Sequence, residues 1–144
     1  GDAIEGEARE VAEAHAALAL EIAAQRLDRP VLLLSGGECT VTRRGDGVGG
    51  PNAEFVLAAV VALKGHPKIY LIACDTDGVD GAAEVAGAIG DPSTLALSEA
   101  MQVSAAAALR DNDAHGFFGA IGAQVVTGPT MTNVNDFRAI LVLP

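Results

Sequence analysis

The stretch VLLLSGGECTVTR, residues 31–43, decides the expected fold of this chain. Its four leading apolar residues form a short run typical of a buried strand, and Gly36-Gly37 interrupts that run. Residues 39–43 then bring strand-forming types such as Thr40, Val41 and Thr42. Because two such runs joined by Gly-Gly are typical of a β-hairpin, we expect two antiparallel strands here.

The segments outside this stretch alternate between helical and strand patterns. A helix is expected over residues 6–27, with Val11, His15, Leu18 and Ile22 on one apolar stripe. Further helices are expected from 51 to about 65 and over 84–86, 93–109 and 113–121, and strands over 69–73, 124–126 and 137–143. This alternation predicts a single α/β domain with a mixed β-sheet, mostly parallel with one antiparallel hairpin, covered by helices.

The composition limits the possible partners. Half of the 144 residues are apolar, which is enough for one substantial core. Nine Lys and Arg stand against 19 Asp and Glu, giving a net charge of −10. An acidic surface repels nucleic acid backbones and anionic membranes, so we expect neither as a partner. Phosphate chemistry would need positive charge from a metal or from another domain.

Cysteine usage and hydropathy indicate the compartment. Cys39 and Cys74 have no C-x-x-C spacing, which favours a reduced pair over a disulfide or a zinc site. No window approaches 18 uninterrupted apolar residues, and the first residues lack a signal-peptide pattern. We therefore expect a soluble, cytoplasmic protein.

A glycine loop at residues 45–50 matches G-x-G-x-x-G between an expected strand and an expected helix. Pro51 stands where the first helical residue would fall, and backbone N–H groups at a helix start favour an anion. The loop is compatible with nicotinamide dinucleotide binding, with a phosphate or substrate loop, or with a purely structural turn. The sequence leaves all three interpretations open.

An acidic loop follows the expected strand 69–73. Asp75, Asp77 and Asp80 offer carboxylates suited to Mg²⁺, which needs only one or two from protein when phosphates complete its shell. The spacing does not fit an EF-hand, because Val79 and Ala86 occupy ligand positions of that motif. The alternative is a set of Asx-turns, in which these side chains bind their own backbone.

Two further polar segments interrupt the apolar pattern. In Ser35-Gly36-Gly37-Glu38, the serine is no nucleophile elbow, because Leu33 stands where that motif needs glycine. Glu38 could hold a metal or a hydroxyl group, or face solvent in a plain turn. The turn 127–136 offers hydroxyl and amide groups for a polyol or phosphate, or for its own backbone. These groups are Thr127, Thr130, Thr132, Asn133 and Asn135.

Four motifs in this order resemble one family. They are SGGE with the following TVT at 40–42, GGPNAEF at 49–55, DTDGVDG at 75–81 and TGPTMTNVND at 127–136. Together they resemble the MOFRL domain, the C-terminal part of the glycerate 2-kinase and hydroxypyruvate reductase family. The resemblance implies ATP-dependent phosphorylation of D-glycerate to 2-phosphoglycerate with Mg²⁺. It also implies a cleft shared with a larger, Rossmann-like N-terminal domain, without which the fragment is expected to be inactive.

The resemblance divides the chain and assigns residues. Residues 1–30 would be a lead-in helix linking to the missing domain, and residues 31–144 the MOFRL-like domain. The implied catalytic residues are Glu38 and Asp75, and the implied metal ligands are Asp75, Asp77 and Asp80. The implied substrate- or phosphate-binding residues are Ser35, Gly36, Gly37, Gly47, Gly49, Gly50, Asn52, Glu54, Thr130, Asn133 and Asn135.

The chain departs from the family pattern in its glycine loop. Val48 and Pro51 stand where many members have arginines, and because an arginine holds phosphate more strongly than a backbone amide, we expect a smaller catalytic share from this fragment. Arg43 and Arg44 lie close by in sequence and could substitute. An NAD(P)H-dependent hydroxypyruvate reductase domain and a non-catalytic ligand-binding module remain the alternatives, and the sequence leaves a homodimer open.

Overall fold

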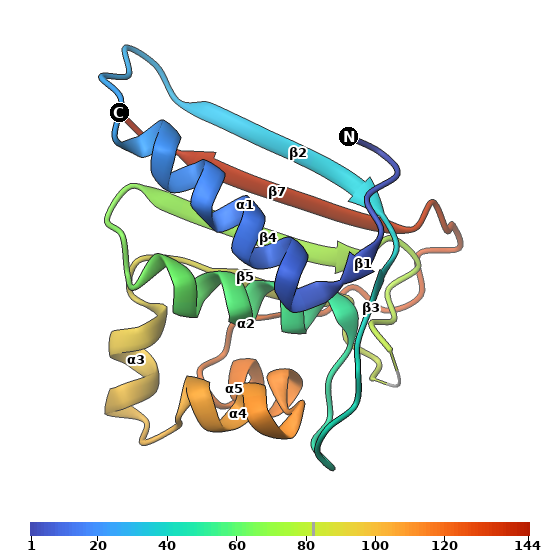
Figure 1. Ribbon diagram of the computed structural model, residues 1–144. Helices are drawn as coiled ribbons and strands as arrows, with labels where there is room; N and C mark the ends of the chain where they lie inside the picture. Colours follow the sequence, from blue (N-terminus) through green and yellow to red (C-terminus); the bar gives the residue numbers. More distant parts are fainter. Residues whose placement is uncertain (82) are drawn as a thin grey trace.

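The computed structural model describes residues 1–81 and 83–144 as one α/β domain (Figure 1). Its main sheet has five strands in the order β2-β7-β4-β5-β6. The strands are β2 (Val31–Gly37), β7 (Asp136–Val142), β4 (Ile69–Asp75), β5 (Gly87–Gly90) and β6 (Gln124–Val125).

All neighbouring strands of the main sheet are antiparallel, so the expected mostly parallel sheet is wrong. The reason is the place of β7, the last strand in sequence, which inserts between β2 and β4. β2 and β4 do run in the same direction, as the helix between them suggested, but each pairs with β7 instead of with the other. Alternating helices and strands do not determine which strands become neighbours.

The expected hairpin within residues 31–43 is also wrong. β2 continues through Gly36 and Gly37, and the next strand, β3 (Cys39–Thr40), pairs in parallel with β1 (Gly6–Glu7) in a separate two-stranded sheet. Gly37 has φ +122°, and a Cβ there would lie 2.3 Å from the carbonyl oxygen of Ile4. The glycine therefore permits close approach of the N-terminal segment instead of forming a turn.

Five helices accompany the sheet in the described residues: α1 (Ala8–Ala23), α2 (Pro51–Leu63), α3 (Thr94–Ala100), α4 (Ala105–Asp111) and α5 (Ala114–Ala120). The single helix expected over 93–109 is two helices, because Gln102 adopts φ +58° and Ser104 caps α4 by accepting from Ala107 N. The helical piece expected at 84–86 is absent. That segment leads into β5, whose sequence GAIG carries too few strand-forming residues to be predicted.

α2 lies at the centre of the core, and α1 packs across it (Figure 1). The buried face of α1 consists of Ala8, Ala12, Ala16 and Ala19, whereas Leu18 of the expected stripe is 45% exposed. Small residues allow two helices to pack closely. A pattern of large apolar residues does not reveal such a face. α2 is apolar almost all round and buried along nearly its whole length, because the sheet and the other helices surround it.

The two faces of the main sheet differ. Ile69, Leu71, Ile140 and Val142 on one face belong to the core beneath the helices. The opposite face is apolar but uncovered by the described residues, and its large side chains are partly exposed. They are Leu32, Leu34, Tyr70, Ile89 and Phe137. None of the helices in the described ranges is long and apolar enough to cross a membrane.

Candidate functional site

Four of the segments singled out in the sequence lie at one end of the main sheet. β2 and β4 end there and β7 begins there, because β7 is antiparallel to both. Residue 38 follows β2, loop 75–81 follows β4 and turn 127–136 precedes β7. The glycine loop 45–50 leads directly into the first turn of α2, which contacts these segments.

Asn52, in that first turn, connects these segments below the surface. It is 1% exposed, and its Nδ2 donates to Asp136 Oδ1 at 2.6 Å and to Asp80 Oδ1 at 3.3 Å. Asp136 Oδ2 accepts from Cys39 N at 3.1 Å and from Arg138 Nη1 at 2.8 Å. One buried polar network thus connects the start of α2 to Asp80 of loop 75–81, to Asp136 at the end of turn 127–136, and to Cys39.

Asp80 forms the N-terminal cap of α2. Its carboxylate accepts from Asn52 N at 2.9 Å and from Ala53 N at 2.8 Å, and His115 Nε2 lies 3.2 Å from Oδ2. A helix N-terminus favours an anion, and here the protein supplies that anion itself. Asp80 is fully buried in this role, so it has no accessible oxygen to offer a metal ion from solvent.

The glycine loop is fixed by the turn between α4 and α5. Arg44 N and Gly45 N donate to Asn112 Oδ1, at 2.6 and 3.1 Å, and Gly47 N donates to Asp111 O at 2.9 Å. A Cβ on Gly47 would lie 2.4 Å from Cβ of Asp113. The first glycines therefore serve this close backbone contact, which is the structural interpretation left open above.

The end of the same loop borders a hollow. Gly49 N and Gly50 N have no acceptor in the part of the chain that the structure describes. Both residues line a hollow of about 220 Å³ together with Arg43 and Gly81. Arg43 brings a guanidinium group to the loop, where its Nε donates to Gly45 O at 3.1 Å.

Glu54 supports the loop from below. It is 1% exposed, and its Oε1 lies 2.5 Å from Nε of Arg9 in α1. Its Oε2 accepts from Asn112 Nδ2 at 2.9 Å, and Asn112 in turn holds the backbone of Gly45. The carboxylate is thus satisfied by protein groups.

Loop 75–81 and turn 127–136 are joined along their length. Asn133 Nδ2 donates to Asp77 Oδ2 at 3.1 Å, and Thr130 N donates to Asp77 O at 3.2 Å. Thr76 N donates to the carbonyl of Asn135 at 3.2 Å, and the hydroxyl of Thr130 donates to the carbonyl of Thr76. The predicted residues Asp77, Thr130, Asn133 and Asn135 therefore share one polar surface.

Asp75 lies at the base of that surface. Burial raises the pKa of its carboxyl group, and the neighbouring charges of Asp77 and Asp136 raise it further, against a backbone hydrogen bond from Asp77 that lowers it. A divalent cation would relieve this repulsion. Residues 1–81 and 83–144 contain no group of three or more His, Cys, Asp or Glu placed to hold a metal. Asp75 Oδ1 accepts from Asp77 N at 3.0 Å and Asp77 Oδ1 accepts from Val79 N at 2.8 Å, which are the Asx-turns that the sequence left open.

Ser35 and Gly36 line a second hollow, of about 400 Å³, beside Thr76 and Asp136. Loop 75–81 thus runs between the two hollows, since Gly81 lines the first. Glu38 is exposed next to Cys39, whose backbone the polar network fixes. Gly37 is buried against Ile4 and faces neither hollow.

The sequence prediction missed the polar residues that hold the site: the half-buried Arg9 and the buried Asn112, His115, Asp136 and Arg138. A signal did exist for one pair. Asp136 and Arg138 stand two residues apart in an otherwise apolar strand, so opposite charges share one face. That face is the buried one, where Arg138 is 1% exposed and lies 5.7 Å from the ring centroid of Phe55.

The two cysteines are free, as expected. Burial raises the pKa of both thiols, so neither is a reactive thiolate at neutral pH.

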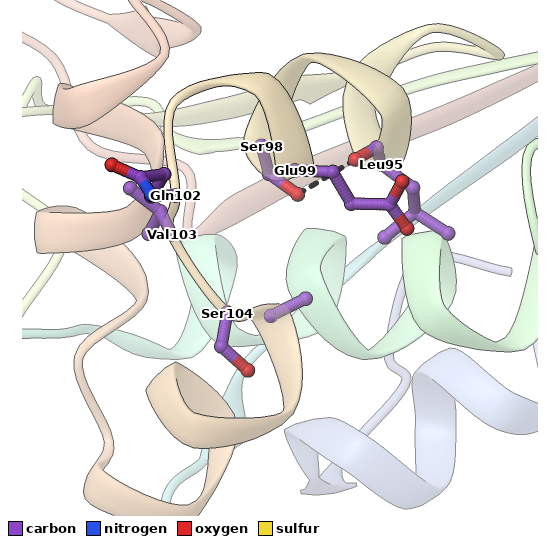
Figure 2. Close-up of a pocket in the computed structure, with 7 residues that line it drawn as sticks. Leu95, Ser98, Glu99, Gln102, Val103 and Ser104 are labelled. Atoms are coloured by element: carbon purple, nitrogen blue, oxygen red, sulfur yellow. Dashed lines mark hydrogen bonds between the residues drawn. The ribbon is translucent and has the colours of Figure 1, made fainter.

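Another hollow, of about 310 Å³, lies between α3 and α4 (Figure 2). It is lined by Leu95, Ser98, Glu99, Gln102, Val103, Ser104 and Ala105, none of which was predicted as a site residue. The hydroxyl of Ser98 donates to the carbonyl of Leu95 at 2.8 Å, and Ser104 caps α4. Two of its polar side chains are thus already used by the helices.

Known proteins resemble this chain over most of its length. The MOFRL family matches residues 31–136. The chain belongs to the MOFRL family. A protein of Agrobacterium vitis named "Putative hydroxypyruvate reductase" is 47% identical over 146 residues, covering 99% of this chain and 33% of that protein. The D-glycerate 2-kinase of Thermotoga maritima is 40% identical over 117 residues, covering 81% of this chain and 28% of the kinase.

A solved structure extends the match to three dimensions. The crystal structure of a glycerate kinase from Thermotoga maritima superimposes with a TM-score of 0.92 and 36% sequence identity, covering 99% of this chain and 35% of that protein. The MOFRL chain thus spans about a third of the length of these relatives and corresponds to their C-terminal region.

Proposed function

We propose that this MOFRL domain forms one side of the active site of a glycerate 2-kinase, which phosphorylates D-glycerate to 2-phosphoglycerate with ATP and Mg²⁺. The observation that carries the proposal is the buried network centred on Asn52. It holds the residue after Glu38, loop 75–81, the base of turn 127–136 and the start of α2 together at one end of the sheet. Phosphoryl transfer depends mainly on such positioning and on charge neutralisation.

The roles of the predicted residues divide into contact and support. We assign Mg²⁺ to Asp75 and Asp77, where the ion would neutralise phosphate charge, and phosphate oxygens to Arg43. Glycerate would bind at the surface of turn 127–136 and the second hollow, through Ser35, Gly36, Glu38, Thr130, Asn133 and Asn135. Asn52, Glu54 and Asp80 would hold these groups in place, because all three are buried and bonded to protein.

The charge of the domain explains why it would need a partner. Its net charge is −10, and Arg43 is the one Lys or Arg among the residues that line the two hollows within the described ranges. We therefore propose that the polypeptide preceding the matched region in the relatives, a Rossmann-like domain, supplies further positive charge across a shared cleft. The domain alone would then not turn over.

A chimera tests this function. This chain replaces the matched C-terminal region of the Thermotoga maritima kinase, and ATP-dependent phosphorylation of D-glycerate is measured by a coupled assay. We expect turnover, and we expect Asp75→Asn and Asp77→Asn to lower kcat about 10²–10³-fold because each removes charge stabilisation from the transition state. Asp91→Asn, a carboxylate before α3 that lines neither hollow, is the matched control. Equal turnover of all three variants would contradict the metal assignment.

The name of the Agrobacterium vitis relative supports a second candidate, hydroxypyruvate reduction by NAD(P)H. The geometry gives it little support, because Asp80 occupies the N-terminus of α2 and the 111–113 turn binds the glycine loop. The same chimera, mixed with hydroxypyruvate and NADH, should show no loss of absorbance at 340 nm. Binding of ATP–Mg²⁺ or glycerate in calorimetry without any turnover would instead indicate a non-catalytic module.

A further inference from the structure

The N-terminal segment runs beside the outer edge of β2. Gly36 N donates to Gly1 O at 2.9 Å, and Gly36 O accepts from Ile4 N at 3.0 Å. Gly1, the earlier residue, accepts from the N–H of Gly36, and Ile4, the later residue, donates to the carbonyl of Gly36. This order of bonds is typical of parallel strands. The same direction continues in the pairing of β1 with β3, where Gly6 lies opposite Cys39. Residues 1–7 therefore run parallel to residues 36–40.

The rest of this edge is open. Backbone N–H and C=O groups point to alternate sides along a strand. Because those of Gly36 point outward, away from β7, those of Leu32 and Leu34 also point to the outer edge. Neither N–H has an acceptor in the ranges 1–81 and 83–144. The two side chains are 54% and 55% exposed on the uncovered apolar face of the sheet. An open apolar edge is a template for pairing with another strand.

We propose that the open edge of β2 binds a further strand, parallel to β2 and continuous with residues 1–7. The polypeptide that precedes the matched region in the full-length relatives would supply it. That strand, α1 and β2 would then form one β-α-β unit, in which a helix connects adjacent parallel strands. The proposal uses the length of the relatives and not their chemistry, so it is independent of the kinase proposal.

A second copy of the chain is the competing occupant of this edge. Two copies related by a two-fold axis would pair their β2 strands antiparallel, whereas residues 1–7 already set a parallel direction. Each copy would also bring a net charge of −10 to the contact. Both observations favour a strand that continues residues 1–7.

Amide hydrogen exchange tests the proposal residue by residue. The chain is compared with the same chain extended at its N-terminus by the residues that precede the matched region in the Agrobacterium vitis relative. About eight residues suffice to span β2 at about 3.3 Å each. We expect the amides of Leu32 and Leu34 to exchange at least about tenfold more slowly in the extended chain. The amide of Leu33, which faces β7, should be protected equally in both.

A Gly-Ser extension of equal length is the matched control and should protect neither leucine. Unchanged exchange at Leu32 and Leu34, with Leu33 still protected, would show that the edge binds no such strand. Protection in the unextended chain that disappears on dilution would assign the edge to a second copy and also overturn the proposal. Should the extension unfold the chain, the same residues added as a free peptide must shift the NMR signals of Leu32 and Leu34, and no shift refutes the proposal.

Discussion

The two ends of α2 hold the domain together by different means. From Phe55 to Leu63 every side chain is apolar, and nearly all are buried against α1 and the sheet. The first turn instead buries Asn52 and Glu54, and each of their contacts reaches a different segment of the chain. Apolar packing tolerates small rearrangement, whereas a buried polar group needs its partners at defined distances. The apolar end therefore sets the fold, and the polar end sets the positions of the loops.

The largest effect should come from breaking the ion pair at the polar end. Asp136→Ala leaves the guanidinium group of Arg138 buried without its carboxylate, and we expect the free energy of unfolding to fall by about 3–5 kcal/mol. Urea denaturation measures the change. The double variant Asp136→Leu with Arg138→Met removes both charges and should recover part of the loss. A double variant less stable than the single one would contradict this explanation.

At the apolar end, Leu57→Ala should cost about 2–5 kcal/mol, because it leaves a cavity at a fully buried position. Its effect should be confined to global stability. Hydrogen exchange of the loop amides, such as Cys39 N and Val134 N, should change no more than the loss of global stability requires. Selective loss of protection in the loops would show that the two ends of α2 are not separable.

Asn52→Ala sharpens the comparison from the other side. It removes donors to two carboxylates, and we expect a loss of about 1–3 kcal/mol, no greater than for Leu57→Ala. Its local effect should nevertheless be larger, with faster exchange of the amides of Cys39 and Ala53 than global unfolding explains. Asn52→Asp, which keeps the shape but adds a third carboxylate, should be worse than alanine.

The smallest expected effect is on the pH dependence of stability, which should differ in sign between Asp75 and Asp91. The folded pKa of Asp75 is raised, mainly by burial, so the native state retains a proton that the unfolded chain releases, and stability falls as pH rises above about 3.8. The hydroxyl of Ser93 and further hydrogen bonds lower the pKa of Asp91, so its contribution is present at neutral pH and is lost as pH falls below about 3.8. Asp75→Asn should thus stabilise the chain at pH 7 and Asp91→Asn should destabilise it, each by at most about 1 kcal/mol because solvent screens both groups. Thermal unfolding at pH 3 and 7 measures the contrast, and shifts of the same sign would contradict it.

The sequence predicted the position of elements better than their pairing. Apolar runs located β2, β4 and β7 within a few residues, because a buried strand must be apolar wherever it lies. Pairing depends on contacts between distant segments, so nothing near residues 31–43 showed that β2 would lie beside residues 136–142. The weakly apolar β5 and the alanine face of α1 were not predicted for a related reason. Both are buried because a neighbouring element approaches closely, and the local sequence does not show that neighbour.

The candidate site divides in the same way. Glycine, aspartate and asparagine clusters located the loops, because residues that cannot join a core remain at strand ends. The division of labour among those residues was not predictable, since Asp77 and Asp80 look alike in sequence. The first is joined to Asn133 at the surface, and the second caps a helix in the core. Each carboxylate accepts from a distant segment, since Asn133 lies 56 residues from Asp77 and Ala53 lies 27 residues from Asp80.

The alanine face of α1 has a consequence for the glycine loop. Alanines on the buried face of α1 let it pack closely on α2, and Arg9 at the start of α1 lies against Glu54. Glu54 in turn holds Asn112, which anchors residues 44 and 45. α1 therefore acts as a spacer. A bulkier residue at Ala12 would push α1 away from α2 and, through Arg9, Glu54 and Asn112, displace the loop, although Ala12 lines neither hollow.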